Sequence, residues 1–326
     1  MRVIHFDYPG PPDVLKISER IIPSPLDDEI LIKVIASGVN RPDLLQREGN
    51  YPAPPGHSDL LGLEASGVIE KMGKNVEGFK VGDKVCSLLD GGGYAEYCVA
   101  KYRQTFKIPD SINFEEAAGL PECFMTCWSN LVDRGKLKTG QKVLIHGGSS
   151  GIGTTAIQIL KLFKSEIFVT VGNEKKKKFC EELGANHVIN YNKEDFDEVI
   201  KSITKRKGVN IILDMVGGNY IQKNIDLLDN EGKLINIAYQ KGSKIELNLI
   251  KVMLKRLTLT GSTLRVRSEN FKSNIVKSLN EFILPRITDG TVKPIIDSVY
   301  DLKDANLAHK NLYKNLHMGK IILSTK

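Results

Sequence analysis

Residues 147–153 read Gly-Gly-Ser-Ser-Gly-Ile-Gly, a pattern that could bind a phosphate group. They follow an apolar run at 140–148, expected to be a strand, and they lead into 151–164, whose apolar residues recur at helical spacing. Glycines at a strand-to-helix turn let the backbone approach an anion, and free N–H groups at the helix start stabilise its charge. The residues predicted to contact the pyrophosphate of a dinucleotide are Gly148, Ser149, Ser150, Gly151 and Ile152.

The residues after the next predicted strand, 166–172, bear on which dinucleotide binds. An NAD-binding fold usually places Asp or Glu there, where its carboxylate bonds the ribose hydroxyls. This chain has Gly172 and Asn173, then Glu174 at a predicted helix start, followed by Lys175 and Lys176. A site that lacks the carboxylate and has lysines nearby suits a 2′-phosphate, so we predict NADP(H). The alternative is that these lysines are only the exposed start of a helix.

A second enzyme family carries a similar glycine loop. Short-chain dehydrogenases place it near the N-terminus and follow it with a catalytic Tyr-x-x-x-Lys on a later helix. Here Tyr97-x-x-x-Lys101 precedes the loop and lies in a predicted strand. The order of the two motifs excludes a short-chain dehydrogenase.

The segment 61–67, Leu-Gly-Leu-Glu-Ala-Ser-Gly, contains one carboxylate among small and apolar residues. A buried carboxylate is costly unless it is hydrogen-bonded or paired. We therefore expect Glu64 to be a structural residue with a hydrogen-bonding or basic partner rather than a catalytic acid.

The elements around these motifs suggest an α/β protein with two domains. Short β segments with Gly-rich turns dominate the first 120 residues and predict a partly barrel-like β domain. From about residue 140 to 262, buried strands alternate with helices, which predicts a parallel sheet of about six strands covered on both faces. The C-terminal residues return to short β segments. We therefore expect a discontinuous β-rich domain, 1–121 and 265–326, and a dinucleotide-binding domain, 122–264.

Composition excludes several classes of protein. The chain has 326 residues, of which 41% are hydrophobic and 26% charged, and no apolar run could span a membrane. Its five cysteines lack C-x-x-C spacing, so we expect reduced thiols and, with no secretory signal at the start, a cytoplasmic location. The net charge of +7 is spread along the chain, so a nucleic acid is not expected as the main partner.

Taken in order, several segments resemble the medium-chain dehydrogenase/reductase superfamily. They are GVNRPDLLQREGNYP, LGLEASGVI, VGDKV, GGGYAEY, LIHGGSSGIGTTAIQ, GANHVINYNKEDF and GKIIL. Within the superfamily the chain is similar to the zeta-crystallin-like quinone oxidoreductases, especially their tumour-suppressor-inducible branch. The resemblance covers almost the whole chain and implies a GroES-like catalytic domain, a Rossmann domain and a homodimer.

The same resemblance implies an enzyme without zinc. Zinc-dependent members carry a Cys within the segment that matches 38–43 and a Gly-His-Glu where this chain has Gly62, Leu63 and Glu64. The four-cysteine loop of a structural zinc also has no counterpart here. A catalytic zinc normally needs three protein ligands. Without it, an electron-poor acceptor such as a quinone is the expected substrate.

Family roles can be carried over to matching positions. Tyr51, Asn40 and Asp43 would border the acceptor and the nicotinamide, although Asn40 could equally serve as a helix cap. Met125 would lie beside them at the domain junction. Gly172, Lys176 and Tyr191 would hold the adenosine phosphate of the cofactor. Ala238, Tyr239 and Leu264 would approach its nicotinamide side. The remaining positions implied to contact the cofactor are Thr126, Val216, Gly217 and Lys320.

Two other functions stay open at this stage. A zinc-free reductase of enones or enoyl thioesters would share these motifs. Some zeta-crystallin-like proteins serve as lens structural proteins or RNA binders, although an intact phosphate loop argues against a purely structural role.

Overall fold

The computed structural model describes residues 1–326 and divides into two compact units. One contains Met1–Met125 and Arg265–Lys326, and the other contains Thr126–Leu264. The second boundary coincides with the one expected from the sequence, whereas the first lies four residues later, inside helix α3 (Pro121–Cys127). No helix has the length and apolar character required to cross a membrane.

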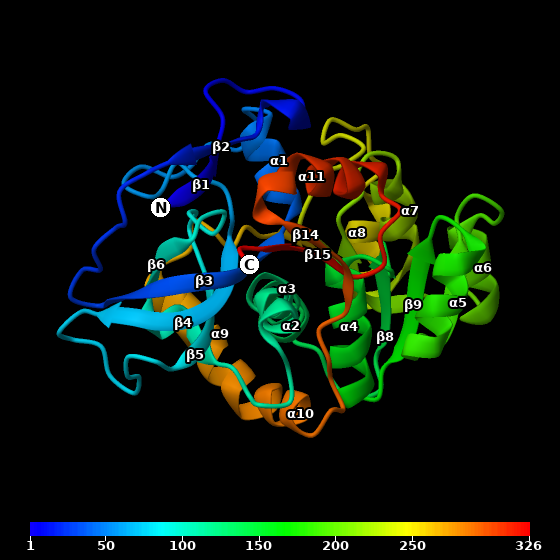
Figure 1. Cartoon of the computed structure of the whole chain (residues 1–326). Helices are drawn as coiled ribbons and strands as arrows, with labels where there is room; N and C mark the ends of the chain where they lie inside the picture. Colours follow the sequence, from blue (N-terminus) through cyan, green and yellow to red (C-terminus); the bar gives the residue numbers. More distant parts are fainter. The chain divides into compact units, whose positions relative to one another are not determined.

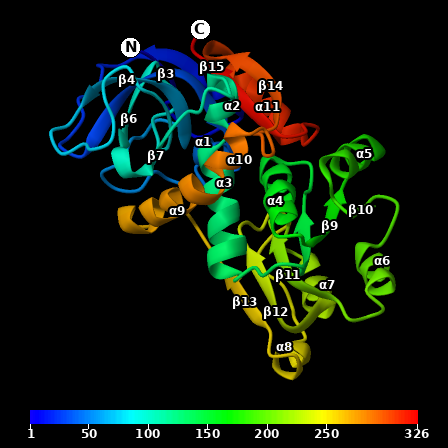
Figure 2. The ribbon, with the colours of Figure 1, turned by 90° about the horizontal axis from the view of Figure 1, so that it is seen from below.

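The Thr126–Leu264 unit is a Rossmann-type α/β domain (Figure 2). Its six strands are all parallel and lie in the order β10-β9-β8-β11-β12-β13, as expected for a dinucleotide-binding sheet. The strands are β8 (Lys142–His146), β9 (Glu166–Val171), β10 (His187–Asn190), β11 (Val209–Asp214), β12 (Leu228–Asn236) and β13 (Thr258–Gly261). The helices are α4 (Gly151–Leu162), α5 (Glu174–Leu183), α6 (Phe196–Ile203), α7 (Tyr220–Leu227), α8 (Ile250–Leu254) and a π-helix, η3 (Trp128–Arg134).

Helices cover both faces of this sheet because its strands are apolar on both sides. Helices α6 and α7 contribute Phe196, Ile200 and Ile225 to a core that also contains Leu144 and Ile212 of the strands. Helices α4 and α5 contact β8, β9 and β10. Burial on both faces explains why the strands read as continuous apolar runs.

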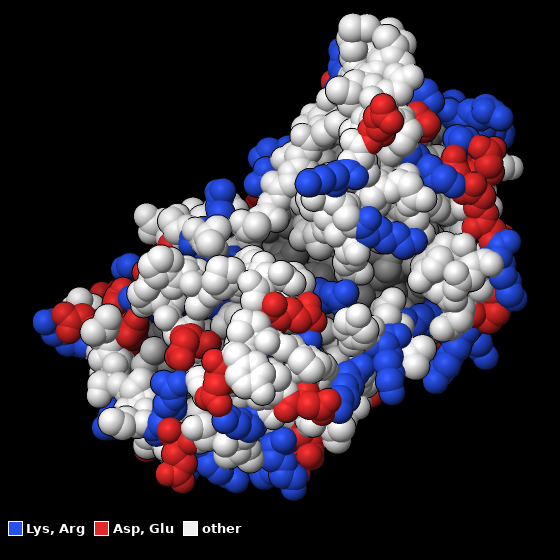
Figure 3. Space-filling model, turned by 90° about the horizontal axis from the view of Figure 1, so that it is seen from above, with Lys and Arg blue, Asp and Glu red and all other residues white.

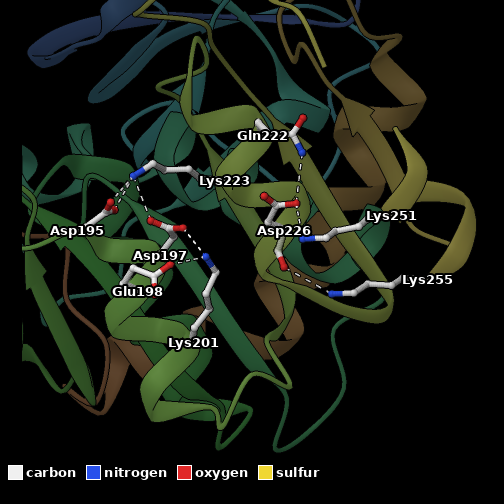
Figure 4. Close-up of polar contacts among 9 residues, drawn as sticks. All are labelled: Asp195, Asp197, Glu198, Lys201, Gln222, Lys223, Asp226, Lys251 and Lys255. Carbon is white, nitrogen blue, oxygen red and sulfur yellow. Dashed lines mark hydrogen bonds and ion pairs between the residues drawn. The ribbon is translucent and has the colours of Figure 1, made fainter. Parts of the chain in front are cut away.

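Charged side chains join α6 to α7 outside the core (Figure 4). Lys223 lies 2.5 Å from Asp195 and 3.1 Å from Asp197, and Lys201 bonds Asp197 at 2.7 Å. Elsewhere, Figure 3 shows basic and acidic side chains interspersed over the face drawn.

The other unit is the β-rich, GroES-like domain (Figure 1). Its main sheet has the order β14-β15-β3-β4-β5-β7, with β6 also paired to β3, while β1 and β2 form a separate hairpin. The strands are β1 (Arg2–His5), β2 (Lys16–Glu19), β3 (Glu29–Val39), β4 (Glu64–Met72), β5 (Lys84–Leu88), β6 (Tyr97–Lys101), β7 (Thr105–Lys107), β14 (Ile296–Asp301) and β15 (Lys320–Ser324). The helices are α1 (Arg41–Arg47), α2 (Phe114–Ala118), α3, α9 (Glu269–Phe282), α10 (Leu284–Thr288) and α11 (Ala305–Lys314), with short 3₁₀ turns η1 (Pro12–Val14), η2 (Tyr102–Gln104) and η4 (Leu302–Asp304).

The α/β class and the two-domain architecture are confirmed, with local differences. The strand expected at 232–239 is β12, which begins at Leu228, and the one expected at 80–89 is β5, which begins only at Lys84. Helices α2 and α9 were not expected. A signal for α2 was present in the sequence, because the Asn113 side chain accepts the Glu116 N–H at 2.8 Å in a capping box.

Candidate functional site

The glycine loop after β8 forms the tight turn that its sequence predicts. Ser150 is the N-cap of α4, where its hydroxyl accepts the Gly153 N–H at 3.0 Å and donates to the Gly147 carbonyl at 2.8 Å. A Cβ on Gly153 would lie 2.3 Å from that carbonyl oxygen, so only glycine lets the helix begin this close to the loop. The start of α4 therefore meets the loop at the carboxyl edge of the sheet, as a phosphate site requires.

The predicted adenosine residues lie on one side of this loop. Sheet order reverses between β8 and β11, and ligands of such sheets bind at that reversal, beyond the carboxyl ends of the strands. Gly172 follows β9 and Tyr191 follows β10. A Cβ on Gly172 would lie 2.7 Å from the Tyr191 hydroxyl, so these two residues adjoin.

Four further residues that the resemblance implies for the cofactor lie on the other side of the reversal, and two of them, Ala238 and Tyr239, are implied on its nicotinamide side. Val216 and Gly217 follow β11, and Ala238 and Tyr239 follow β12. A Cβ on Gly217, whose φ is +68°, would lie 2.7 Å from Cδ1 of Tyr239. The structure thus brings the two loops together at the sheet edge.

The lysines after β9 differ in exposure. Lys176 lies in the first turn of α5 with only 5% of its surface exposed, whereas Lys175 is exposed. Glu174 Oε1 accepts from the Asn190 amide at 2.6 Å and lies 3.2 Å from Lys193, so one oxygen of this carboxylate already contacts protein groups. The proposed phosphate contact of Lys176 stays a prediction.

In the GroES-like domain, Glu64 has the basic partner expected for a buried carboxylate. Its Oε1 lies 2.6 Å from Nζ of Lys320, and its Oε2 accepts the Glu122 backbone N–H at 2.8 Å. Burial alone would lower the pKa of Lys320, but the Glu64 carboxylate offsets this effect and raises that pKa. Lys320 therefore stays a cation, and both side chains of the pair are buried.

Asn40 completes this cluster. It occupies the N-cap position of α1, but its side-chain oxygen accepts from Lys320 at 2.6 Å and its amide donates to Glu64 at 2.9 Å. Lys320 also donates to the Val39 carbonyl at 3.1 Å, which occupies all three ammonium protons. These contacts support a positioning role for both side chains, and cofactor contact by Lys320 stays a prediction.

Asp43 is fully buried and ties two site segments together. One carboxylate oxygen accepts the Gly62 N–H at 2.9 Å, and the other accepts the Asn40 N–H at 2.8 Å and the Tyr94 hydroxyl at 3.3 Å. Burial raises the pKa of Asp43 to about 6, against the opposing effect of the two backbone N–H donors. Its contacts fix the position of both segments, and the catalytic role implied by the resemblance stays a prediction.

This raised pKa leads to a testable pH dependence. A carboxyl pKa raised from 3.8 to about 6 stabilises the fold below the lower value, and this stabilisation is lost as pH rises through the higher one. Asp43→Asn cannot titrate, so its free energy of unfolding relative to wild type should rise by about 2 kcal/mol between about pH 4 and 7. Urea unfolding of both proteins across this range measures the difference. A difference independent of pH would contradict the prediction.

Tyr51 packs over a buried arginine that the sequence did not single out. The Arg265 guanidinium carbon is 5.6 Å from the centre of the Tyr51 ring, and its nitrogens bond Gln46 and the Asp90 carbonyl. The Tyr51 hydroxyl forms no hydrogen bond within the protein. Burial raises its pKa, so it remains a proton donor.

Asp90 is also a carboxylate partner for His57 that could not be identified from the sequence. His57 Nδ1 lies 3.5 Å from Asp90 Oδ2, whose other oxygen bonds the buried Lys272 at 2.6 Å. Neither contact could be predicted from the sequence, because Asp90 is distant from His57 in the sequence and Lys272 comes from α9, much later in the chain.

Comparison with known proteins agrees with this architecture. Residues 26–110 match the model of the alcohol dehydrogenase GroES-like domain, and residues 151–281 match that of the zinc-binding dehydrogenases. The chain is 32% identical to a human quinone oxidoreductase, over 99% of this chain and 97% of that protein.

Two solved structures show the same likeness in three dimensions. Escherichia coli quinone oxidoreductase complexed with NADPH superposes with a TM-score of 0.88 at 29% identity, covering 99% of this chain and all of the other. The CurK enoyl reductase gives a TM-score of 0.88 at 26% identity, covering 99% and 98%. The chain belongs to the medium-chain dehydrogenase/reductase superfamily and is an oxidoreductase. Its full-length similarity to proteins named quinone oxidoreductase confirms the resemblance inferred from the sequence.

Proposed function

We propose that the protein transfers a hydride from NADPH to a quinone and does so without zinc. The observation that carries the proposal is the ion pair between Glu64 and Lys320. This pair places the Lys320 ammonium group against the Glu64 carboxylate. The residue before Glu64 is His in zinc-dependent relatives and Leu63 here.

The donor set of this segment does not fit a catalytic zinc, although one matching family model is described as zinc-binding. Leu63 offers no donor atom, and nowhere do three or more His, Cys, Asp or Glu side chains gather to hold a metal. Lewis-acid activation of an alcohol is then not available from these residues. A quinone suits the site because its ring is already electron-poor, so positioning and exclusion of water would suffice.

The residues of the Rossmann domain fit NADPH, which supplies the hydride when bound. The glycine loop would hold the pyrophosphate on the N-terminus of α4. After β9 the chain presents Gly172 rather than a carboxylate, with Lys175 exposed nearby, which favours a 2′-phosphate. The NADPH in the E. coli relative supports this choice.

One assay tests the proposal. Purified protein is mixed with NADPH or NADH and with ortho-quinones, para-quinones or enoyl thioesters, and zinc is measured on the same sample. We expect faster consumption of NADPH, reduction of quinones and less than stoichiometric zinc. Stoichiometric zinc would refute the metal-free mechanism, and faster consumption of NADH would refute the cofactor choice.

An enoyl-thioester or enone reductase is the second candidate, favoured by the structural likeness to the CurK enoyl reductase. Both reactions add a hydride to an electron-poor carbon and would use the same cofactor loops. Turnover of the thioester without turnover of any quinone would establish this alternative.

We also propose that the protein is a homodimer joined through β13. This edge strand has one free side, Leu259 is 38% exposed, and the nearby helix α8 exposes Met253 and Leu254. Unpaired edge strands readily pair with another chain. Leu259→Lys should therefore shift the mass measured by sedimentation from dimer to monomer, whereas Val81→Lys, at an exposed residue of the other unit, should leave it unchanged. A wild-type monomer would refute the proposal.

None of the five cysteines forms a disulfide and all five are buried, which supports the expected cytoplasmic location.

A further inference from the structure

A buried row of hydrogen-bonded polar side chains, here called the polar row, lies beneath the carboxyl edge of the parallel sheet. It contains Thr170 at the end of β9, His146 at the end of β8, Asn224 of α7 and Asp214 at the end of β11. Each is at most 1% exposed. Neither the phosphate loop nor hydride transfer, as described above, accounts for these residues. Buried polar groups in such numbers are costly unless each has a partner.

The hydrogen bonds of the polar row all point in one direction, from Thr170 toward Asp214. The Asn224 amide donates to Asp214 at 3.2 Å, so the Asn224 oxygen accepts from His146 Nε2 at 2.8 Å. His146 Nδ1 is then the acceptor for the Thr170 hydroxyl at 3.0 Å. Burial lowers the pKa of His146, which keeps the ring neutral, as this pattern needs.

The two ends of the polar row, Thr170 and Asp214, contact the two loops that flank the reversal of strand order. At one end, the Gly147 N–H lies 3.4 Å from the Thr170 hydroxyl and 3.1 Å from the Thr170 carbonyl. At the other, Asp214 Oδ1 accepts the Val216 N–H at 2.6 Å and the Gly217 N–H at 3.2 Å. The polar row thus connects the phosphate loop to the loop after β11.

Asp214 is a side-chain anchor of the loop after β11, which also forms backbone hydrogen bonds with residues 240–242. Gly217 and Gly218 have φ values of +68° and +56°, in the left-handed region, so this turn needs a fixed acceptor to select its conformation. Asp214 supplies it, and the Asn236 amide adds another donor to the carboxylate at 3.1 Å. All of its partners are neutral groups, and neutral N–H donors can hold a carboxylate firmly when several converge on it.

We propose that Asp214 is a positioning residue that shapes the loop after β11 for the nicotinamide half of the cofactor. This inference rests on the proposed function. The phosphate loop follows β8, and the adenosine residues follow β9 and β10, so the loops after β11 and β12 are left for the nicotinamide ribose and ring. Asp214 is buried and acts on the cofactor only through Val216 and Gly217.

Selective binding measurements test this role. Asp214→Asn keeps the shape of the side chain but replaces an acceptor oxygen by a donor. We expect the Kd for NADPH to rise roughly tenfold, because charge-assisted hydrogen bonds to the loop are lost. The Kd for 2′,5′-ADP, which lacks the nicotinamide half, should stay within about twofold on the same reasoning. A role only in stability would weaken both ligands alike.

Thr204→Val is the matched control. The Thr204 hydroxyl accepts the Gly208 N–H at 3.1 Å just before β11, so the substitution also removes an acceptor from a glycine N–H, at the opposite end of the strand. It should change neither Kd. If Asp214→Asn does not fold, Asn236→Ala should give the same selectivity at roughly threefold, because it removes a single hydrogen bond.

The outcomes separate this inference from the proposed function. Asp214→Asn that binds NADPH like wild type, or that loses both ligands equally, would overturn the inference, and so would a non-selective Asn236→Ala if Asp214→Asn cannot be folded. Wild-type protein that binds NADPH but reduces no quinone would overturn the proposed function and leave the role of Asp214 intact.

Discussion

Lys320→Met is expected to lower the free energy of unfolding by about 3–5 kcal/mol, because it leaves the Glu64 carboxylate buried without its cation. Glu64 is 0% exposed, and both of its oxygens face a compact interior formed by β3, β4 and β15. Its other partners, the Asn40 amide and the Glu122 N–H, are neutral and do not replace the ammonium. Chemical denaturation at neutral pH measures the loss.

Two further variants make this result specific. Lys326→Met removes an ion pair with Glu115 in the same unit, but its 3.9 Å separation and 70% exposed lysine place it on the surface, where the expected cost is below about 1 kcal/mol. Combining Glu64→Gln with Lys320→Met removes both buried charges and should recover much of the stability. Equal small effects of Lys320→Met and Lys326→Met would show that the buried pair contributes little.

The need of Glu64 for a partner could be predicted from the sequence, but the identity of that partner could not. Desolvation requires some donor near any buried carboxylate, whichever element provides it. Lys320 lies next to Glu64 because β15 pairs antiparallel with β3. Ile321 is opposite Val39, and this register places Lys320 beside Asn40. Such long-range pairing has no local signal in the chain.

The Rossmann domain was more predictable than the β-rich one for a related reason. Its strands are buried on both faces and its helices are amphipathic, so each element carries its own pattern. The glycine loop could also be located, because its tight turn restricts residue type at Gly153. Asp214 was missed because its partners in the loop are backbone N–H groups, which do not depend on residue type. Its two side-chain partners, Asn224 and Asn236, come from α7 and β12, later in the chain.

Replacing Tyr51 by Phe is expected to lower kcat for quinone reduction roughly a hundredfold, as removal of one oxyanion donor does in other enzymes. Hydride addition leaves negative charge on a quinone oxygen, and the Tyr51 hydroxyl is a protonated donor with no hydrogen bond inside the protein. The Arg265 guanidinium, 5.6 Å from the ring centre, packs against the ring and restrains its position. The Kd for NADPH should not change, since only the acceptor loses a contact. Steady-state kinetics and cofactor titration measure the two quantities.

The control for this variant is another tyrosine beside an arginine. The Arg103 guanidinium lies 4.9 Å from the centre of the Tyr102 ring, and this pair belongs to the 3₁₀ turn η2 rather than to the site. Tyr102→Phe should therefore keep wild-type kcat. Tyr51→Ala should in addition raise KM for the quinone, because it removes the ring as well as the hydroxyl and leaves Arg265 without its packing partner. Wild-type kcat in Tyr51→Phe would mean that the hydroxyl takes no part in the reaction. A normal kcat in both Tyr51 variants would remove this residue from the site, because neither the donor nor the ring would then matter to turnover.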